Sequence, residues 1–412
     1  MARIKAKGPL VEIRGDETAA VVHQLVRECI IQPHFDIPLT SFDLSLENRE
    51  ATGDDVTHGA AAAVAEAQVA VKCSTITPNR TRAEQYGLSQ LWKSPNATLR
   101  KALNGVIFRE PIVIEQIPRL VPGWASPIVV ARHANADQYQ ASEFTVPGAG
   151  RLTLKFTPAD GSAPIERTVT DYGADGGVAM GMYNNADSIR TFARTCFAQA
   201  LRLGMPLYFS TKNTVLKEYD GAFVDAFEQV FAREFAGEFA RAGLAYEHRL
   251  IDDMVAFAIK SSGGFLWALK NYDGDVQGDI VAQGFGSPGL MASVLAGADG
   301  QTCLFEAAHG TVARHFARWQ LGERLSTNPI ATITAWARAL GHRGALDGDQ
   351  TLREAADRIE RAVVDTVASG IMTDDLAVLA GGGVEGVATG QFIDAVATRL
   401  STLLKTNRGA GT

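Results

Sequence analysis

The first 74 residues alternate between strand-like and helix-like segments, and this alternation limits the folds that the chain can adopt. Short apolar runs at residues 10–14, 37–44 and 69–74 are typical of strands, whereas residues 18–31 and the alanine-rich residues 54–68 are typical of helices. Strands that alternate with helices favour helices packed on a largely parallel sheet. The sequence therefore predicts an α/β protein.

The residue pattern changes in the middle of the chain. Between residues 132 and 181 glycine and proline are frequent, and alternating runs such as residues 151–156 are typical of β-hairpins. We therefore expect an inserted β-rich subdomain. After it the α/β pattern resumes, with a helix at 188–203, a strand at 207–210 and a helical tail that includes 352–368 and 391–404.

Size and charge exclude several classes of protein. At 412 residues the chain exceeds one ordinary core, so we expect two domains or one large domain with an insertion. The net charge of −7 argues against a general nucleic-acid surface, and any site for acidic ligands must be a local basic pocket. No apolar run is long enough to cross a membrane.

Four cysteines, Cys29, Cys73, Cys196 and Cys303, lie far apart in the sequence. They form no Cys-x-x-Cys pair, and no paired histidines stand at zinc-ligand spacing, so we expect buried, reduced thiols. Residues 1–7 are basic but lead into no apolar signal segment, and residues 408–412 carry no peroxisomal or endoplasmic-reticulum signal. A cytoplasmic protein is expected.

The segment Lys93-Ser-Pro-Asn-Ala-Thr-Leu-Arg100 has the composition of an anion-binding helix start. Ser94 stands at the N-cap and Pro95 at the first helical position, which concentrates free backbone N–H groups at one spot. Asn96 and Arg100 are four residues apart and share a face of that helix. An ordinary capped helix with solvated arginines is the alternative. Because Arg109 and Arg132 follow, a ligand with more than one carboxylate is favoured.

Acidic residues suggest a divalent-metal site. Asp275 and Asp279 are four residues apart and share a face if the segment is helical, as carboxylate ligands of Mg²⁺ or Mn²⁺ would. An EF-hand fails, because Gly284 stands where the bidentate glutamate is needed. Asp252 and the adjacent Asp253 are either a helix N-terminus or further metal ligands.

Two glycine-containing segments are candidates for nucleotide binding. Residues 284–289 match the pattern G-x-G-x-x-G, but no clean buried strand precedes them, so a turn is the better interpretation. His309-Gly310-Thr311 offers a loop that a ligand can approach closely, with Arg314 and His315 beside it, as an extra ribose phosphate would require. An ordinary glycine turn beside a surface arginine is the alternative.

Two further residues are candidates for proton transfer. Lys212 directly follows a predicted strand, and the pKa of a lysine near metal-bound oxygen can be lowered. Tyr139 lies near cations in the sequence and could act as an acid. A single lysine or tyrosine is more often a surface or packing residue.

Taken together, these segments resemble the NADP-dependent isocitrate dehydrogenases of the eukaryotic-type, homodimeric subfamily. The resemblance runs from near Val11 to beyond Leu376 and includes Arg119. It is carried by Val71-Lys-Cys-Ser-Thr-Ile-Thr-Pro78, Trp92-Lys-Ser-Pro-Asn96, Gly176-Gly-Val-Ala-Met-Gly-Met-Tyr-Asn184, Ser210-Thr-Lys-Asn-Thr214, Tyr246-Glu-His-Arg-Leu-Ile-Asp-Asp-Met-Val255, Lys270-Asn-Tyr-Asp-Gly-Asp-Val-Gln277 and Glu306-Ala-Ala-His-Gly-Thr-Val312.

The resemblance implies the isocitrate/isopropylmalate dehydrogenase-like fold. A large α/β domain is expected from residues 1–103 and 286–412, a small α/β domain from 104–136 and 186–285, and a β-rich clasp subdomain from 137–185. The clasp is expected to help tie two subunits together in a homodimer.

The resemblance also implies a reaction and its residues. The reaction is the oxidative decarboxylation of isocitrate to 2-oxoglutarate and CO₂ with reduction of NADP, dependent on Mg²⁺ or Mn²⁺, as in the tricarboxylic acid cycle. Isocitrate is expected at Thr77, Ser94, Asn96, Arg100, Arg109 and Arg132; the metal at Asp275 and Asp279 with Asp252 of the other subunit; and catalysis at Tyr139 and Lys212, the latter also reaching across the dimer. NADP is expected at Thr75, Ile76, Thr77, Arg82, Lys260, His309, Gly310, Thr311, Val312, Arg314, His315 and Asn328.

Two alternatives stay open. A dehydrogenase for a related acid, such as an isopropylmalate or homoisocitrate, is disfavoured because polar Ser94 and Asn96 suit a third carboxylate better than an alkyl chain. A catalytically silent binding protein is disfavoured by intact Tyr139 and Lys212. One departure from the family is that Met-Thr-Arg does not follow Gly15-Asp-Glu, which concerns packing near the cofactor.

Overall fold

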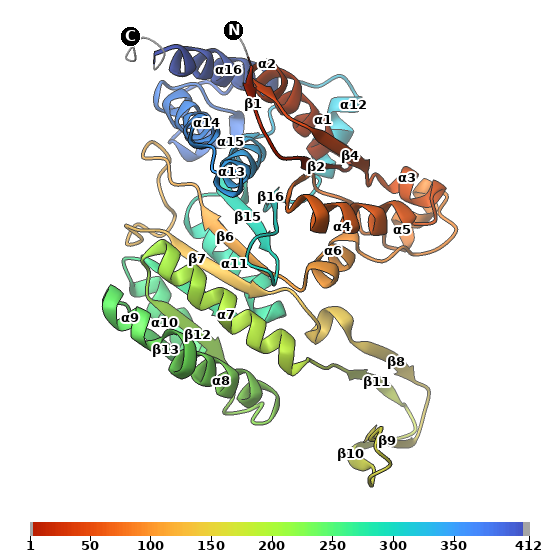
Figure 1. The fold of residues 1–412 in the computed structure, drawn as a ribbon. Helices are drawn as coiled ribbons and strands as arrows, with labels where there is room; N and C mark the ends of the chain where they lie inside the picture. Colours follow the sequence, from red (N-terminus) through yellow and green to blue (C-terminus); the bar gives the residue numbers. More distant parts are fainter. Residues whose placement is uncertain (1–2, 407–412) are drawn as a thin grey trace.

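A computed structural model describes residues 3–406, and one ten-stranded sheet runs through it (Figure 1). The strand order is β13-β12-β14-β7-β6-β15-β16-β5-β2-β4. The strands of this sheet are β2 Leu10–Arg14, β4 Leu39–Asp43, β5 Val69–Lys72, β6 Val106–Pro111, β7 Ile128–His133, β12 Leu207–Thr211, β13 Tyr246–Leu250, β14 Phe265–Leu269, β15 Met291–Ala296 and β16 Cys303–Ala307. Short β1 Ile4–Lys5 and β3 Phe35–Asp36 form a separate parallel pair.

The sheet is parallel at both ends and antiparallel at its centre. Strands β13, β12, β14 and β7 pair in parallel, as do β16, β5, β2 and β4. Between these groups, β6 pairs antiparallel with both β7 and β15, and β15 pairs antiparallel with β16. The predicted α/β class is confirmed, with the antiparallel centre as a feature that the sequence did not reveal.

Helices cover both faces of the sheet, which is why strands such as β5 are buried along their whole length. The α-helices are α1 Glu17–Val26, α2 Gln32–His34, α3 Leu46–Ala51, α4 Asp55–Ala67, α5 Arg80–Tyr86, α6 Pro95–Leu103, α7 Ala186–Leu203, α8 Tyr219–Val230, α9 Ala236–Ala242, α10 Ile251–Lys260, α11 Asn271–Gly284, α12 Ala313–Gln320, α13 Ile330–Leu346, α14 Gln350–Ala368, α15 Asp374–Leu379 and α16 Thr389–Thr406. Helical turns of other types are η1 Arg27–Ile31, η2 Asp137–Gln140, η3 Phe231–Phe235 and η4 Pro288–Leu290.

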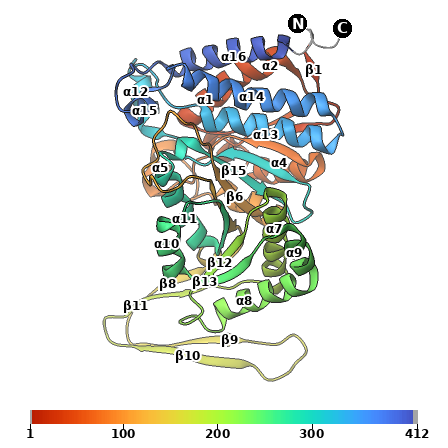
Figure 2. The ribbon, with the colours of Figure 1, turned by 90° about the vertical axis from the view of Figure 1, so that its left-hand side faces the viewer.

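The sheet divides the core into clusters, and successive residues of one strand can belong to clusters on opposite faces. In β6, Phe108 packs in a cluster with α7 and α8, whereas its neighbour Ile107 packs in another with α4 and α6. The largest cluster joins α1, α13, α14 and α16 at the other end of the sheet, and these helices lie together in Figure 2. Because neighbouring residues of a strand point to opposite faces of the sheet, β6 and β15 contribute side chains to a different environment on each face.

Two antiparallel ribbons extend away from the remainder of the chain (Figures 1 and 2). One pairs β8 Ser142–Val146 with β11 Gly177–Gly181, and the other pairs β9 Gly150–Phe156 with β10 Ile165–Tyr172. The expected β-hairpin insertion is confirmed, but it begins later than residue 132, because Arg132 and His133 belong to β7 in the central sheet.

The other local predictions can be compared directly with the structure. The predicted helix at 18–31 is α1 continued by the π-helical η1, and the segment 284–289 is the end of α11 and a turn, as expected. All four cysteines are free, but Cys29 and Cys303 are only partly buried, so the expectation of four buried thiols was wrong for these two. Residues 1–2 and 408–412, on which the targeting predictions partly rest, lie outside the described residues. In residues 3–406, no helix has both the length and the apolar character to span a membrane.

A buried acid links β2 to α1. Glu12 is 1% exposed and accepts hydrogen bonds from Arg27 Nη1 at 2.9 Å and from the Ser41 hydroxyl at 2.6 Å, while its other oxygen lies 3.1 Å from His23 Nε2. Burial by itself would raise the pKa of Glu12, but these hydrogen bonds and the charges of His23 and Arg27 overcome it and lower the pKa to about 2. Ionised Glu12 therefore stabilises the fold.

Candidate active site

Two arginines on neighbouring central strands form the floor of the site. Arg109 of β6 is 9% exposed and Arg132 of β7 is 1% exposed. Helix α11 passes directly over both, because it has glycine where a side chain would collide. A Cβ on Gly274 would lie 2.7 Å from Arg132 Cβ, and one on Gly278 would lie 3.0 Å from Arg109 Nη1.

The next residue after each of these glycines is an aspartate that meets an arginine. Asp279 Oδ1 lies 2.6 Å from Arg109 Nη1, and Asp275 Oδ1 is paired with Arg132 Nη1 and lies 3.6 Å from Arg109 Nη2. Tyr139, from η2, donates its hydroxyl hydrogen bond to the second oxygen of Asp275. The predicted helical spacing of Asp275 and Asp279 is therefore correct, and the helix presents both carboxylates at the same place.

Charge and burial perturb these groups. Burial, assisted by the nearby charge of Arg100, lowers the pKa of Arg132 to about 10. Burial, together with the hydrogen bond to Asp275, raises the pKa of Tyr139 to about 12, although Arg132 lies 4.7 Å from the centre of its ring and opposes this. Two buried donors, Arg109 Nε and Arg132 Nη2, have no hydrogen-bond partner in the described residues. The unpaired arginine donors could bind an anionic ligand, and the carboxylates beside them could bind a metal ion that accompanies it.

Helix α6 supplies the third arginine. Ser94 occupies the N-cap and Pro95 the first position, as predicted, but the Ser94 side chain does not cap the helix. Arg100 lies on the same helix, and burial lowers its pKa. The charge of Arg109 lowers this pKa further, whereas the charge of Glu306 raises it. The structure thus brings Arg100, Arg109 and Arg132 within electrostatic reach of one another, as the sequence predicted.

Lys212 and Asp252 form a second group. Lys212 follows β12, Asp252 lies in the first turn of α10, and Lys212 Nζ is 2.6 Å from Asp252 Oδ1. Asp275 and Asp279 do not share this contact: their partners are Arg109, Arg132 and Tyr139. Across residues 3–406 no three acidic, histidine or cysteine side chains gather as a metal site would require. In one chain Lys212 therefore pairs with Asp252, and not with Asp275 or Asp279.

The predicted cofactor segments meet where β5 and β16 end. These strands are parallel neighbours, so the loops 73–79 and 308–312 emerge at the same edge of the sheet, where ligands commonly bind. The Ser74 hydroxyl donates to the His309 carbonyl at 2.8 Å. Buried Thr75 Oγ1 and His309 Nε2 have no hydrogen-bond partner among the described residues, so both are available to a polar ligand.

The remaining cofactor candidates divide between two places. Arg314 and His315 lie on α12 directly after the His309 loop, and His315 Nδ1 lies 2.7 Å from the Thr327 hydroxyl beside Asn328. Lys260 ends α10, which packs on β12 and β13. Four strands separate β12 from β16 in the sheet.

Comparisons with known proteins identify the family of this chain. The family model for isocitrate/isopropylmalate dehydrogenase matches residues 8–396. The chain belongs to the isocitrate/isopropylmalate dehydrogenase family. It is 54% identical over 398 residues to isocitrate dehydrogenase 1 (NADP) of Mycobacterium tuberculosis, covering 97% of both chains. It is 53% identical to isocitrate dehydrogenase (NADP) of Sphingobium yanoikuyae, covering 97% of this chain and 98% of that one, and 52% identical to the mitochondrial isocitrate dehydrogenase (NADP) of Bos taurus, covering 98% and 90%.

In this member of the isocitrate/isopropylmalate dehydrogenase family, two buried acids that the sequence did not single out support the segments that carry candidate residues. Asp137, in η2 beside Tyr139, accepts hydrogen bonds from the Asn271 backbone N–H at 3.2 Å and from the Tyr219 hydroxyl. Asp220 is fully buried and accepts the backbone N–H of Lys212 at 2.8 Å. For Asp220, the one signal in the sequence is that an acidic residue stands within an apolar helix pattern. This signal is a weak indication of a role.

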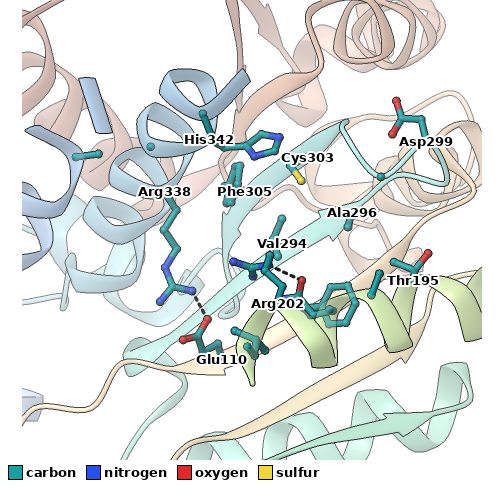
Figure 3. A pocket seen from close by; sticks show the side chains of 18 of the residues that line it. Glu110, Thr195, Arg202, Val294, Ala296, Asp299, Cys303, Phe305, Arg338 and His342 are labelled. Atoms are coloured by element: carbon teal, nitrogen blue, oxygen red, sulfur yellow. Dashed lines mark hydrogen bonds and ion pairs between the residues drawn. The ribbon is translucent and has the colours of Figure 1, made fainter. Parts of the chain in front are cut away.

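A cleft of about 930 Å³ lies on the opposite face of the central strands (Figure 3). Glu110 of β6 and Val294 of β15 line it, and Arg338 of α13 reaches Glu110 across it at 2.8 Å. Because strand residues alternate between faces, Arg109 points away from this cleft and toward α11. None of the residues predicted for the active site lines it.

Proposed function

We propose that this protein catalyses the oxidative decarboxylation of isocitrate to 2-oxoglutarate and CO₂ with reduction of NADP, and that it requires Mg²⁺ or Mn²⁺. One observation carries the proposal: buried Arg109 and Arg132, each with an unpaired donor, lie directly against Asp275 and Asp279. The relatives named as NADP isocitrate dehydrogenases, similar over nearly the whole chain, support the choice of substrate and cofactor.

The substrate is assigned to the basic floor and the start of α6. Arg100, Arg109 and Arg132 would bind carboxylates of isocitrate, since the planar guanidinium matches a carboxylate with two parallel hydrogen bonds. Ser94, Asn96 and Thr77 would bind the carboxylate that distinguishes isocitrate from simpler hydroxy acids. The Ser94 hydroxyl accepts no hydrogen bond from a backbone N–H of the helix, so it is available to the substrate, which supports this assignment.

The metal ion is assigned to Asp275 and Asp279 of one chain together with the partner subunit's Asp252. A set of carboxylate oxygens suits a hard cation such as Mg²⁺ or Mn²⁺. On binding, the two aspartates would exchange their present contacts with Arg109 and Arg132 for the ion, which frees those arginines for the substrate.

Catalysis is assigned to Lys212 and Tyr139. When bound, the divalent ion supplies a Lewis acid that lowers the pKa of the substrate hydroxyl, and NADP accepts the hydride. Lys212 would help to remove the hydroxyl proton as the hydride leaves. Tyr139 would donate a proton to the carbon that CO₂ leaves. Its pKa of about 12 keeps the phenol protonated at neutral pH, as a proton donor requires.

NADP is assigned to the loops that follow β5 and β16. Thr75, Ile76, Thr77 and Arg82 would contact it from one side, and residues 309–312 with Asn328 from the other. Arg314 and His315, with Lys260, supply the positive charge that a 2′-phosphate requires and that NAD would leave without a partner.

We further propose a homodimer in which each active site draws on both chains. The ribbons expose Phe144, Phe156 and Val178 by 55%, 61% and 78%, and two-stranded ribbons are marginally stable alone in water. Ile259 on α10 and Ile280 on α11 are 47% and 45% exposed beside the candidate site. A second copy of the chain that covers these surfaces would contribute its own Lys212, Asp252 and Lys260 to the site.

The domain division at residues 1–103 with 286–412, 104–136 with 186–285, and 137–185 is part of the same proposal. It places the boundary between β6 and β15, where the antiparallel centre of the sheet lies. A cytoplasmic location stays a prediction, since the relatives include mitochondrial enzymes. The net charge of −7 still disfavours a nucleic-acid partner.

The test is an absorbance assay for reduced nicotinamide with isocitrate and Mg²⁺. Rapid reduction of NADP and slow reduction of NAD are expected. Reduction only with an isopropylmalate in place of isocitrate would support the alternative within the family. Binding of isocitrate with no reduction of either cofactor would support the silent binding protein.

A further inference from the structure

The start of α1, from its N-cap residue Asp16 to Thr18, contacts the proposed cofactor segments through three consecutive side chains. Asp16 accepts the backbone N–H of Ile76 at 2.7 Å. Glu17 pairs with Arg82 Nη2 at 2.8 Å, and the Thr18 hydroxyl donates to the Val312 carbonyl at 3.0 Å. These contacts join both loops of the proposed NADP site to one helix start, although no sequence motif indicates a role for these three residues.

Glu17 has the most unusual position of the three. Its carboxylate is buried, with 4% of the side chain exposed, and it also accepts a hydrogen bond from the Thr311 hydroxyl. Its backbone has φ +54°, in the left-handed region that residues with a side chain seldom adopt. Val312, in the loop that it contacts, has φ +57°. Strained backbone of this kind persists where surrounding contacts hold it, and it concentrates at functional sites.

The departure from the family pattern after Gly15-Asp-Glu lies at these contacts. Thr18 occupies the position where the family has methionine, and its hydroxyl provides the bond to Val312. The Ala19 N–H donates to the Thr311 carbonyl at 3.2 Å. The helix start therefore contacts the 309–312 loop through its backbone and side chains together.

We propose that Glu17 is a positioning residue for NADP, which rests on the proposed function. Its two carboxylate oxygens hold Arg82 from α5 and Thr311 from the opposite loop. Before the cofactor binds, this fixes the Arg82 side chain and the 309–312 backbone in the positions where they meet the nucleotide. Binding then costs less ordering of these groups, which increases affinity for NADP without a direct contact between Glu17 and the reacting atoms.

The test measures equilibrium binding of NADP by calorimetry, with the full-length protein and without isocitrate. The variant E17Q keeps the size of the side chain and removes its charge. It is expected to weaken NADP binding by about tenfold, because a charge-assisted bond to Arg82 is lost, while binding of isocitrate with Mg²⁺ stays unchanged. The matched control is E66Q, which removes the same charge from an exposed position on α4.

Two results separate positioning from a general structural effect. In an R82M background, E17Q is expected to have little further effect on NADP affinity, because the two residues act through one contact. Additive losses would show that Glu17 does not act through Arg82. Unchanged affinity in E17Q, or tighter binding through relief of repulsion between Glu17 and the phosphates, would overturn the proposal.

If E17Q does not fold, the same contact can be removed from its other end. T311V lacks the hydroxyl that donates to Glu17, and T311S keeps it. Weaker NADP binding in T311V than in T311S supports the proposal, and equal binding contradicts it. Failure of the wild-type protein to bind NADP at all would instead refute the proposed function.

Discussion

The substitution G274A is a sensitive probe of how α11 presents its carboxylates. A Cβ at this position would lie 2.7 Å from Arg132 Cβ and 3.0 Å from Arg132 Cα, where ordinary contacts begin near 3.4 Å. Helix and strand would therefore have to separate by about 0.7 Å at a point next to Asp275. Overpacking of this kind costs roughly 1–3 kcal/mol, against a gain of up to about 1 kcal/mol when alanine replaces glycine in a helix.

We expect G274A to lose about 1–2 kcal/mol of stability in urea unfolding and to lose about 10–100-fold in kcat/KM for isocitrate, since displacements near 1 Å at reacting groups have effects of that size. The matched control is G341A, in the interior of α13, where a Cβ would make an ordinary 3.5 Å contact with Ala356 Cβ. It should be as stable as the wild type or slightly more stable, with unchanged kinetics. A G274A protein with wild-type stability and activity would refute the close packing of α11 on Arg132.

Three other predictions follow from contacts described above. Because the pKa of Glu12 is about 2 in the fold against 4.5 as its reference value, ionised Glu12 contributes stability that is complete above about pH 4.5 and is lost as the pH falls toward 2. The stability gap between wild type and E12Q, of about 3 kcal/mol at neutral pH, should narrow over that range in urea titrations, and a gap independent of pH would contradict this. R338M, which breaks the pairs with Glu110 and Glu360 in the cleft behind the sheet, should cost about 1 kcal/mol of stability and leave steady-state kinetics unchanged; altered kinetics would link that cleft to the active site. Removal of divalent ions with EDTA should abolish NADP reduction and leave NADP binding intact by calorimetry, and Mg²⁺ should restore the activity.

Local signals in the sequence predicted much of the fold. Ser94 before Pro95 marked the start of α6, and the alanine-rich run 54–68 became α4 at Asp55–Ala67, because capping and periodicity act between residues close in sequence. The spacing of Asp275 and Asp279 likewise depends on one helix. The antiparallel centre of the sheet was not predicted, since strand direction is decided by pairing between β6 and β15, nearly 200 residues apart in sequence.

The supporting residues of the site were beyond prediction for the same reason. Asp220 supports Lys212, and Glu17 joins Arg82 to Thr311, through contacts that exist only in the folded chain. Gly274 lies in one of the segments that carry the family resemblance, but its close approach to Arg132 depends on how α11 packs against β7. The residues assigned to a ligand lie in short segments that recur in the family. The residues that support them are brought to them only by tertiary packing.

The proposed division of the catalytic groups between two chains is tested most directly by combining two inactive variants. D275N and K212M would be co-expressed with different affinity tags, and the heterodimer would be purified and assayed for isocitrate-dependent reduction of NADP. If each site joins Asp275 of one chain to the partner subunit's Lys212, one of the two sites is intact and about half of the wild-type activity returns. If both groups act within one chain, each site carries a defect and the heterodimer is as inactive as its parents.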